Sequence, residues 1–193
     1  MESFSKHSKN LILSSKSPRR QQLLKELGWE FTVKVLDVEE IYPDHLIREE
    51  VPLFLAGLKA SAFEDALTEN DILITGDTVV YIDDLIIGKP VDFDDAVSTL
   101  KRLSGRKHEV ITGICLKSSV KQKSFHVVTD VYFKELKDEE IRYYIEKYKP
   151  YDKAGAYGIQ EWIGLIGIEK IHGSYFNVMG LPIRELYEAL IAF

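Results

Sequence analysis

The sequence predicts an α/β fold in which one domain, residues 1–193, contains a mixed β-sheet flanked by helices. Short β-rich runs alternate with segments of helical periodicity along the whole chain. One pair of runs reads as a hairpin, whereas others are joined through helices, so parallel and antiparallel pairings are both expected. A chain with 45% hydrophobic residues can also bury a single core without cross-links. Cys115, the only cysteine, lies in an apolar run and is expected to be a buried thiol.

The first elements carry clear boundary signals. Residues 11–13 read as a short buried strand, followed by Ser17 and Pro18, a helix cap and a proline suited to the first helical position. Leucines 23, 24 and 27 supply the apolar face of that helix. Gly28 is placed to end it in the left-handed conformation, and residues 31–36 follow as a second strand.

The next segment predicts a helix and a hairpin. Pro52 opens the helix, whose apolar stripe is expected to comprise Leu55, Leu58, Ala62 and Ala66. Residues 72–75 and 79–82 are β-rich runs interrupted by Gly76-Asp77-Thr78, where a bend or bulge is plausible. Asp83-Asp84 then separates the second run from residues 85–87, which predicts a hairpin.

The second half contains three more predicted helices, over residues 94–103, 138–148 and 182–191. Residues 110–117 and 125–133 are strand candidates. The glycine-punctuated stretch from residue 152 to residue 180 gives no regular pattern.

Composition and motifs exclude several classes of function. A formal net charge of -6 argues against general nucleic-acid binding, and no apolar run is long enough to span a bilayer. The polar residues 1–10 show no targeting signal, so we expect a cytoplasmic protein. Neither GxxxxGK[ST], GxGxxG nor GxSxG occurs. The histidines are too scattered for a zinc site: His7, His45, His108, His126 and His172.

A basic helix start is the strongest local indication of a ligand. Ser15, Ser17, Arg19 and Arg20 lie where a strand ends and a helix begins. Arginines in a first helical turn oppose the helix dipole, and a bound anion would reverse that effect. Backbone N–H groups, hydroxyls and guanidinium groups together suit a phosphate. The alternative is a pair of solvated surface arginines.

Three lysines are further candidates. Lys59 shares a helical face with apolar residues, so its ammonium group either points toward a site or extends along the surface into solvent. Lys89 follows a strand, and Lys153 opens the glycine-rich stretch. Both positions allow a side chain to meet a ligand.

Asp77 is the most informative acid, because it lies between apolar strand segments where an unpaired carboxylate would be costly. Its partner could be a lysine, a magnesium ion or an attacking water molecule. A simple turn or cap aspartate is the alternative. Glu40, in a run of acids, would by itself be read as solvated surface.

The chain resembles the Maf family of nucleotide pyrophosphatases through segments that occur in order along its whole length. They are SKSPRR at residues 15–20, the acidic residues 37–40, Lys59-Ala60, GDTVV at 76–80, GKP at 88–90, LSG at 103–105, HEV at 108–110, DKAGAYGIQ at 152–160, GSY at 173–175 and NVMGLP at 177–182.

This resemblance implies a Maf/ITPase-like fold with a central cleft, a homodimer and divalent-metal-dependent (Mg²⁺ or Mn²⁺) cleavage of nucleoside triphosphates to monophosphates and pyrophosphate. Asp77 matches the proposed proton acceptor, and it or Glu40 could bind the metal. Arg19, Thr78 and Gln160 match positions that separate a dTTP/UTP-preferring group from a 7-methyl-GTP-preferring one, and the Asp77-Thr78 pair indicates the former. The other polar positions around the triphosphate are matched by Ser15, Ser17, Arg20, Lys59, Lys89 and Lys153.

We therefore expect a house-cleaning enzyme of nucleotide pools. Two alternatives stay open: a nucleotide-binding regulator of cell division with little turnover, and a 7-methyl-GTP pyrophosphatase. The sequence departs from the family where Glu161-Trp162 follows Gln160, a place at which the family commonly has glycine. That departure puts the base-recognition loop in doubt.

Overall fold

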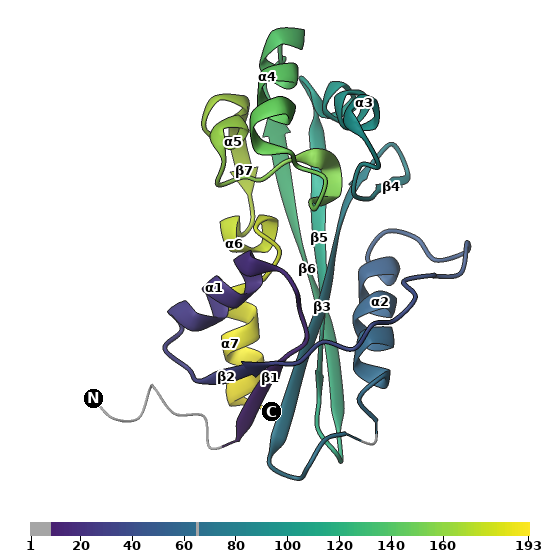
Figure 1. Ribbon diagram of the computed structural model, residues 1–193, viewed down its shortest axis with the longest axis vertical. Coiled ribbons are helices and arrows are strands. Elements are labelled where there is room, and N and C mark those ends of the chain that lie inside the picture. Colours follow the sequence, from purple (N-terminus) through teal and green to yellow (C-terminus); the bar gives the residue numbers. More distant parts are fainter. Residues whose placement is uncertain (1–8, 65) are drawn as a thin grey trace. The chain divides into compact units, whose positions relative to one another are not determined.

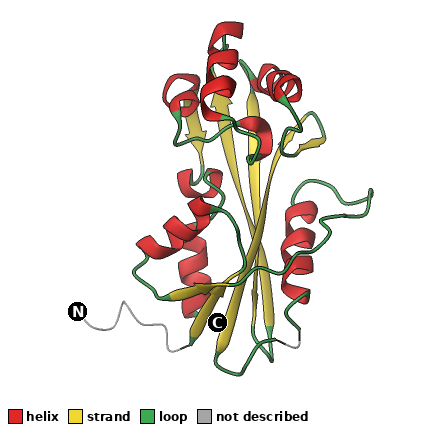
Figure 2. Ribbon diagram, viewed as in Figure 1, coloured by secondary structure: helices red, strands yellow, loops and turns green. Residues whose placement is uncertain are grey.

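The protein, seen in a computed structural model, is described for residues 9–64 and 66–193. Its strands form one mixed seven-stranded sheet in the order β2-β1-β3-β5-β6-β7, with β4 paired to β3, and helices flank it (Figures 1 and 2). The expected α/β class is confirmed. The elements are β1 (Asn10–Leu13), α1 (Pro18–Glu26), β2 (Phe31–Val33), α2 (Glu50–Ser61), β3 (Asp71–Ile82), β4 (Leu85–Ile87), α3 (Phe93–Leu103), β5 (Lys107–Lys117), β6 (Gln122–Phe133), α4 (Asp138–Tyr148), the 3-10 turn η1 (Ala154–Ala156), α5 (Trp162–Gly167), β7 (Ile168–His172), α6 (Tyr175–Val178) and α7 (Ile183–Ile191).

The chain divides into two compact units. Unit 1 comprises the described residues up to Asp77, together with Thr112–Val127 and Gly180–Phe193. Unit 2 comprises Thr78–Ile111 and Val128–Met179. The division falls within strands β3, β5 and β6, so these strands contribute residues to both units. That residues 1–193 act as a single domain stays a prediction.

In unit 1 the parallel strands β1 and β3 support helix α2. Leu73 lies opposite Ile12 in the strand register, and both belong to a buried cluster with Ala56 and Ala60 of the helix. Thr75, two residues further along β3, donates a hydrogen bond of 2.7 Å to the backbone oxygen of Ala56. The same cluster contains Cys115, so the expected buried thiol is confirmed.

Helix α2 approaches strand β5 closely at one glycine. A Cβ atom added to Gly113 would lie 2.4 Å from the carbonyl carbon of Pro52 and 2.6 Å from the amide nitrogen of Leu53. No other residue type fits at such a backbone approach. Gly113 therefore fixes how near the first turns of α2 lie to the sheet.

Helix α1 has the predicted boundaries. It begins at Pro18, and the hydroxyl of Ser17 accepts a hydrogen bond of 3.5 Å from the amide of Arg20, as expected of an N-cap. After the helix, Gly28 has a φ of 76°, the left-handed conformation predicted for it. Leu23 and Leu24 are buried, so the predicted apolar face is largely confirmed.

Unit 2 contains the predicted hairpin and a separate apolar core. Strands β3 and β4 pair antiparallel, with Ile82 opposite Leu85. The two linking residues, Asp83 and Asp84, have φ values of 54° and 58°, which matches a two-residue turn of type I′. The core of this unit packs around the following buried side chains: Val80, Leu100, Val110, Val131, Ile145 and Ile163.

Some boundaries differ from the prediction. Strand β2 ends at Val33, and β3 is continuous across Gly76-Asp77-Thr78. Helix α2 starts two residues before Pro52 and ends at Ser61, so Ala62 and Ala66 are exposed and do not extend its apolar stripe. The stretch from 152 to 180 contains η1, α5, β7 and α6, which are too short to show a periodic pattern.

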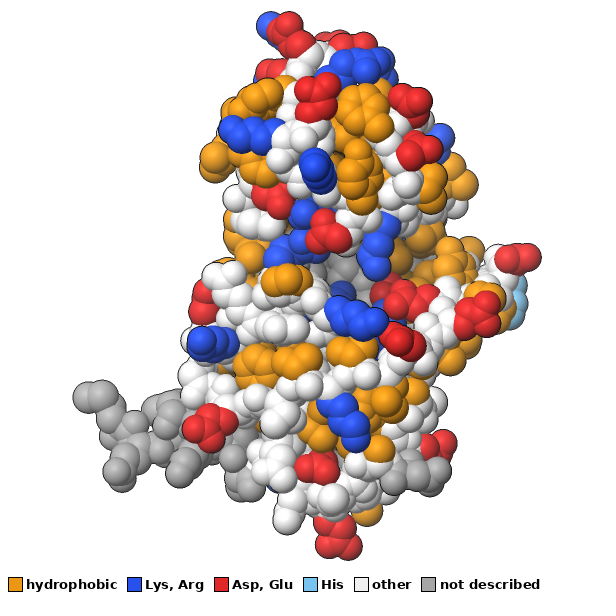
Figure 3. All heavy atoms as spheres, viewed as in Figure 1, with side chains coloured by type: hydrophobic (Ala, Val, Ile, Leu, Met, Phe, Trp, Pro, Cys, Tyr) orange, Lys and Arg blue, Asp and Glu red, His pale blue; other side chains and the backbone are white. Residues whose placement is uncertain are grey.

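No helix in the described part of the chain is long and apolar enough to cross a membrane. The expectation that no targeting segment is present falls largely on residues 1–8, which lie outside the described residues. On the face drawn in Figure 3, acidic and basic side chains are interspersed. This face therefore shows no broad basic surface of the kind that general nucleic-acid binding needs.

Candidate functional site

A lysine held by two carboxylates forms the centre of the predicted site in unit 1. The Lys59 Nζ atom lies 2.6 Å from Oδ1 of Asp77 and 3.1 Å from Oε1 of Glu40. The side chains of Lys59 and Asp77 are each 15% exposed, whereas that of Glu40 is 45% exposed. The structure thus joins three of the predicted site residues in one contact.

The periodicities of the two elements explain this meeting. Side chains alternate along a strand, so Asp77 lies on the face of β3 that carries Leu73 and Thr75, the face packed against α2. On the helix, Lys59 lies one turn from Ala56 and beside Ala60, whose side chains are fully buried. The apolar contacts therefore place the ammonium group of Lys59 against the carboxylate of Asp77.

This arrangement decides the alternatives for Lys59 and gives Asp77 one partner, a lysine, whereas the roles of Asp77 toward a metal ion or water stay predictions. Lys59 does not extend into solvent, so the surface interpretation of this lysine is wrong. Asp77 has the partner that its apolar surroundings require. The carboxylates of Asp77 and Glu40 face the ammonium group of Lys59, and their charges also act on the buried guanidinium group of Arg20, so cationic and anionic groups face each other here.

The chemistry of these oxygen atoms suits a divalent cation. Carboxylates are ligands preferred by Mg²⁺, which usually binds one or two of them and completes its coordination with water and substrate phosphates. Asp77 and Glu40 both reach the same Lys59 nitrogen, so their oxygens converge on one region. Among residues 9–64 and 66–193, no group of three His, Cys, Asp or Glu side chains could hold a metal by itself. The donor set therefore fits a metal that arrives with a phosphorylated substrate.

Arg20 is not a solvated surface arginine. Its Nε atom donates to the backbone oxygen of Gly180 at 2.7 Å, and its Nη1 atom donates to the backbone oxygen of Gly76 at 2.8 Å. Burial lowers the pKa of the guanidinium group, against the opposing effect of the Asp77 charge. Arg20 thereby fixes the backbone directly before Asp77, and whether it also contacts substrate stays a prediction.

The serines near this helix start hold the loop in shape. The hydroxyl of Ser15, which is buried, accepts a hydrogen bond of 3.2 Å from the amide of Ser17. The hydroxyl of Ser17 caps the helix. Arg19 is partly buried, on the first turn of α1. That Ser15, Ser17 and Arg19 bind an anion stays a prediction.

Unit 2 contains a second lysine between two carboxylates. The Nζ atom of Lys153 lies 2.7 Å from Oδ1 of Asp152 and 3.2 Å from Oε1 of Glu161, and its side chain is only 9% exposed. The other oxygen of Glu161 accepts a hydrogen bond from the hydroxyl of Tyr144, a fully buried residue of α4. That hydroxyl in turn accepts a hydrogen bond of 3.0 Å from the amide of Gly158.

The tyrosine in this network is a stable proton donor. Burial raises the pKa of Tyr144, and the hydrogen bond and negative charge of Glu161 raise it further. The phenol therefore stays protonated and donates to the carboxylate. Neither Tyr144 nor Glu161 was predicted as a site residue. The available signal was the unusual glutamate directly after Gln160.

The remaining predicted residues of unit 2 are less enclosed. Gln160 is exposed, and its amide nitrogen would lie 3.1 Å from a Cβ atom at Gly158. Thr78 is partly buried on β3. Lys89 is exposed after β4, and its ammonium group makes no hydrogen bond or ion pair to any described residue. Contacts through Glu161 and Tyr144 join Lys153 to the backbone at Gly158, two residues before Gln160.

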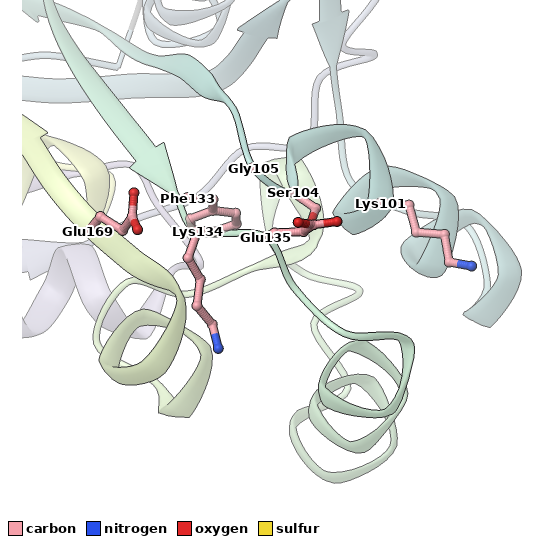
Figure 4. A pocket seen from close by; sticks show the side chains of 7 residues that line it. All are labelled: Lys101, Ser104, Gly105, Phe133, Lys134, Glu135 and Glu169. Atoms are coloured by element: carbon pink, nitrogen blue, oxygen red, sulfur yellow. The ribbon is translucent and has the colours of Figure 1, made fainter.

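Unit 2 also contains a cavity of about 550 Å³ (Figure 4). It is lined by Lys101, Ser104, Gly105, Phe133, Lys134, Glu135 and Glu169. Its two lysines already pair with carboxylates, Lys101 with Asp138 and Lys134 with Glu140, both at 2.8 Å. No predicted site residue lines the cavity, so we do not assign it to the site.

Comparison with known proteins gives the family. The profile of the family described as Maf-like protein matches residues 10–193. A protein of Phocaeicola vulgatus named dTTP/UTP pyrophosphatase is 54% identical over 181 residues, covering 93% of this chain and 94% of its own. A protein of the same name from Flavobacterium johnsoniae is 53% identical over 180 residues, covering 93% of each chain.

A solved structure shows the same fold. The Staphylococcus aureus Ham1 protein matches with a TM-score of 0.51 and 16% sequence identity, over 95% of this chain and 99% of that one. The profile and the relatives both extend over nearly the whole sequence, in agreement with the ordered motifs. The chain belongs to the Maf-like protein family.

Proposed function

We propose that this protein hydrolyses nucleoside triphosphates, with dTTP and UTP preferred, to nucleoside monophosphates and pyrophosphate. Relatives about half identical over 93% of the chain carry the name dTTP/UTP pyrophosphatase. The observation that carries the proposal is the contact of Lys59 with Asp77 and Glu40. These residues provide a carboxylate base, a cation for phosphate and a second carboxylate.

The chemistry needs one base and several positive charges. In the proposed step, Asp77 accepts a proton from water as the water oxygen attacks the α-phosphorus. The bond from that phosphorus to the oxygen bridging to the β-phosphate breaks, and pyrophosphate leaves with the bonding electrons. Lys59 is close enough to Asp77 to contact the same phosphate region, where it would stabilise the developing charge.

A divalent metal would be held by Glu40 and Asp77 together with the substrate phosphates, and it would supply charge neutralisation of the triphosphate. Full metal coordination lowers the basicity of a carboxylate, so Asp77 serves either mainly as base or mainly as ligand. Without substrate, Lys59 pairs with the carboxylates of Asp77 and Glu40. When the triphosphate and metal bind, Lys59 would pair with phosphate oxygens instead.

The other assignments of the resemblance are part of the same proposal. Arg19, Thr78 and Gln160 would set the preference for the base, and Lys89 and Lys153 would bind the triphosphate, with Ser15, Ser17 and Arg20 at the helix start. We also propose a homodimer, a cytoplasmic location and a role in cleaning the nucleotide pool. The homodimer and the role in the nucleotide pool rest on the family resemblance, whereas the cytoplasmic location rests on the sequence pattern of residues 1–10 and the lack of a long apolar run.

The test is pyrophosphate release from dTTP, UTP, CTP, GTP and 7-methyl-GTP, each with Mg²⁺, with Mn²⁺ and with a chelator. We expect release from dTTP and UTP to exceed that from the other nucleotides, and the chelator to abolish it. Preferential cleavage of 7-methyl-GTP would overturn the assigned specificity. No release from any nucleotide, together with saturable binding of UTP, would favour the nucleotide-binding regulator.

A further inference from the structure

We infer that Glu161 is a positioning residue that holds Lys153 and the adjoining segment up to Gln160 for nucleotide binding; this inference rests on the proposed function. Lys153 and Gln160 lie on a glycine-containing segment whose only regular structure is the short turn η1. Backbone hydrogen bonds hold the main chain of this segment at Lys153, Gly155 and Ala156. They do not fix the Lys153 side chain, whose position depends on the groups that its ammonium contacts.

Glu161 makes those contacts with both carboxylate oxygens. Oε1 lies 3.2 Å from the Lys153 ammonium group, and Oε2 accepts the proton of the Tyr144 hydroxyl. Because Tyr144 is fully buried in α4, it provides a fixed point for the carboxylate. The chain of contacts therefore runs from the helix core through Glu161 to the lysine.

The backbone is adapted to this placement of the carboxylate. A Cβ atom at Gly158 would lie 2.8 Å from the Glu161 carboxylate carbon and 3.1 Å from the Gln160 amide nitrogen. Both side chains therefore lie over the bare backbone of Gly158. The amide of Gly158 also donates to Tyr144, so the same residue is held from both sides.

Glu161 does not serve the more ordinary role that its position offers. It is the N-cap residue of α5, but its side chain makes no capping hydrogen bond. Its backbone oxygen accepts from the amide of Gly164 at 2.9 Å, which requires no particular side chain. The carboxylate is thus directed to Lys153 and Tyr144 at the expense of a helix cap.

The main test is Glu161→Gln, measured by kcat and KM for UTP and dTTP. Removing this negative charge would, by charge alone, strengthen binding of a polyanion and lower KM. Misplacing Lys153 has the opposite effect, and we expect KM to rise on the order of tenfold with a smaller change in kcat. Glu139→Gln, which removes an exposed carboxylate of α4, is the charge-matched control and should leave both constants unchanged.

Two further variants separate positioning from a general loss of structure. Tyr144→Phe removes only the hydroxyl and should raise KM in the same direction, whereas Tyr143→Phe, one residue earlier and exposed, should not. In a Lys153→Met background, Glu161→Gln should change KM by less than about twofold, because the two residues act as one unit. Unfolding temperatures are recorded for every variant.

The outcomes distinguish this inference from the proposed function. If the wild-type protein releases no pyrophosphate, the proposed function fails. If the wild type is active but Glu161→Gln keeps its KM or lowers it, the positioning role is contradicted. Effects of Glu161→Gln and Lys153→Met that multiply in the double variant would also overturn it, since they would show independent actions.

Discussion

Each unit contains a lysine held between two carboxylates, and the two clusters differ in how firmly the carboxylates are fixed. Lys59 contacts Asp77 and Glu40 at 2.6 and 3.1 Å, and Lys153 contacts Asp152 and Glu161 at 2.7 and 3.2 Å. The distances are nearly the same. In unit 1 the shorter contact is to Asp77, which is 15% exposed, and the longer is to Glu40, which is 45% exposed. In unit 2 the order is reversed: the shorter contact is to Asp152, which is 58% exposed, and the longer is to Glu161, which is 18% exposed and bonded to buried Tyr144.

This difference indicates different roles for similar groups. An exposed carboxylate can exchange its lysine partner for a metal ion or water at small cost, because solvent screens the pair. A carboxylate that is tied to a buried phenol is not free to exchange, so it maintains one position of its lysine. We therefore assign chemistry to the cluster of Lys59, Asp77 and Glu40, and substrate positioning to that of Lys153, Glu161 and Tyr144.

The largest expected effect is on the kinetic constants of variants in which either lysine is replaced. Lys59→Met should lower kcat for UTP by about 100-fold or more, because it removes charge stabilisation next to the base. Lys153→Met should act mainly on KM. Lys101→Met, which breaks an exposed pair with Asp138, is the control and should be near wild type. Equal losses of kcat for Lys59→Met and Lys153→Met would contradict the division of roles.

A smaller effect is expected at Gly158. A methyl group there would displace the Glu161 carboxylate, so Gly158→Ala should reproduce the KM increase of Glu161→Gln. Crowding of a packed site should also lower the free energy of unfolding by about 1–3 kcal/mol. Steady-state kinetics and urea unfolding measure both effects. If Gly158→Ala lost stability but kept the wild-type KM, displacement of the Glu161 carboxylate would not affect nucleotide binding by Lys153, and the positioning role would be contradicted.

The smallest effect on activity, but a defined effect on stability, is expected at His108 in unit 2. Burial lowers the pKa of His108 to about 3, and its Nε2 atom lies 2.8 Å from the Tyr157 hydroxyl. Between pH 6.5 and about 3 the unfolded chain binds a proton that the folded chain does not. As the pH is lowered through this range, the free energy of unfolding should therefore decrease, by up to about 1.4 kcal/mol per pH unit.

His108→Gln removes this titration and should flatten the pH dependence of urea unfolding between pH 7.5 and pH 5. His172→Gln is the control, because that side chain is 80% exposed. Activity at pH 7.5 should stay near wild type in both variants. A pH dependence that is the same in His108→Gln and wild type would show that His108 does not carry this proton.

The sequence predicted much of the fold because local signals agreed with the final packing. Helix α4 has the predicted bounds, and the hairpin turn at Asp83-Asp84 adopts the left-handed conformations typical of its two residues. The meeting of Lys59 with Asp77 follows from helix and strand periodicity once α2 packs on β3. The short elements after residue 152 could not be predicted, because they are too short to show a periodic pattern and depend on contacts with residues distant in sequence.

The candidate site was predictable as a set of residues but not as a geometry. The basic helix start indicated a phosphate site, yet the direction of the Arg20 donors depends on Gly76 and Gly180, which are distant in sequence. Glu161 and Tyr144 are 17 positions apart and meet only through the folding of unit 2. Contacts of this kind leave no spacing pattern in a single sequence.

Asp77 is proposed to act in the reaction, and strand β3 provides an internal control. Asp71 is buried at the other end of that strand, where burial disfavours its carboxylate, but hydrogen bonds from Thr68 and Asn10 lower its pKa nonetheless. Asp71→Asn should therefore lower stability and leave kcat unchanged.

The decisive measurement is single-turnover UTP hydrolysis by Asp77→Asn and Asp71→Asn beside the wild type, with unfolding temperatures for all three. We predict that Asp77→Asn loses about 100-fold to 10,000-fold in the rate of the chemical step while remaining folded. A folded Asp77→Asn protein that hydrolyses UTP at the wild-type rate would contradict a catalytic role for Asp77.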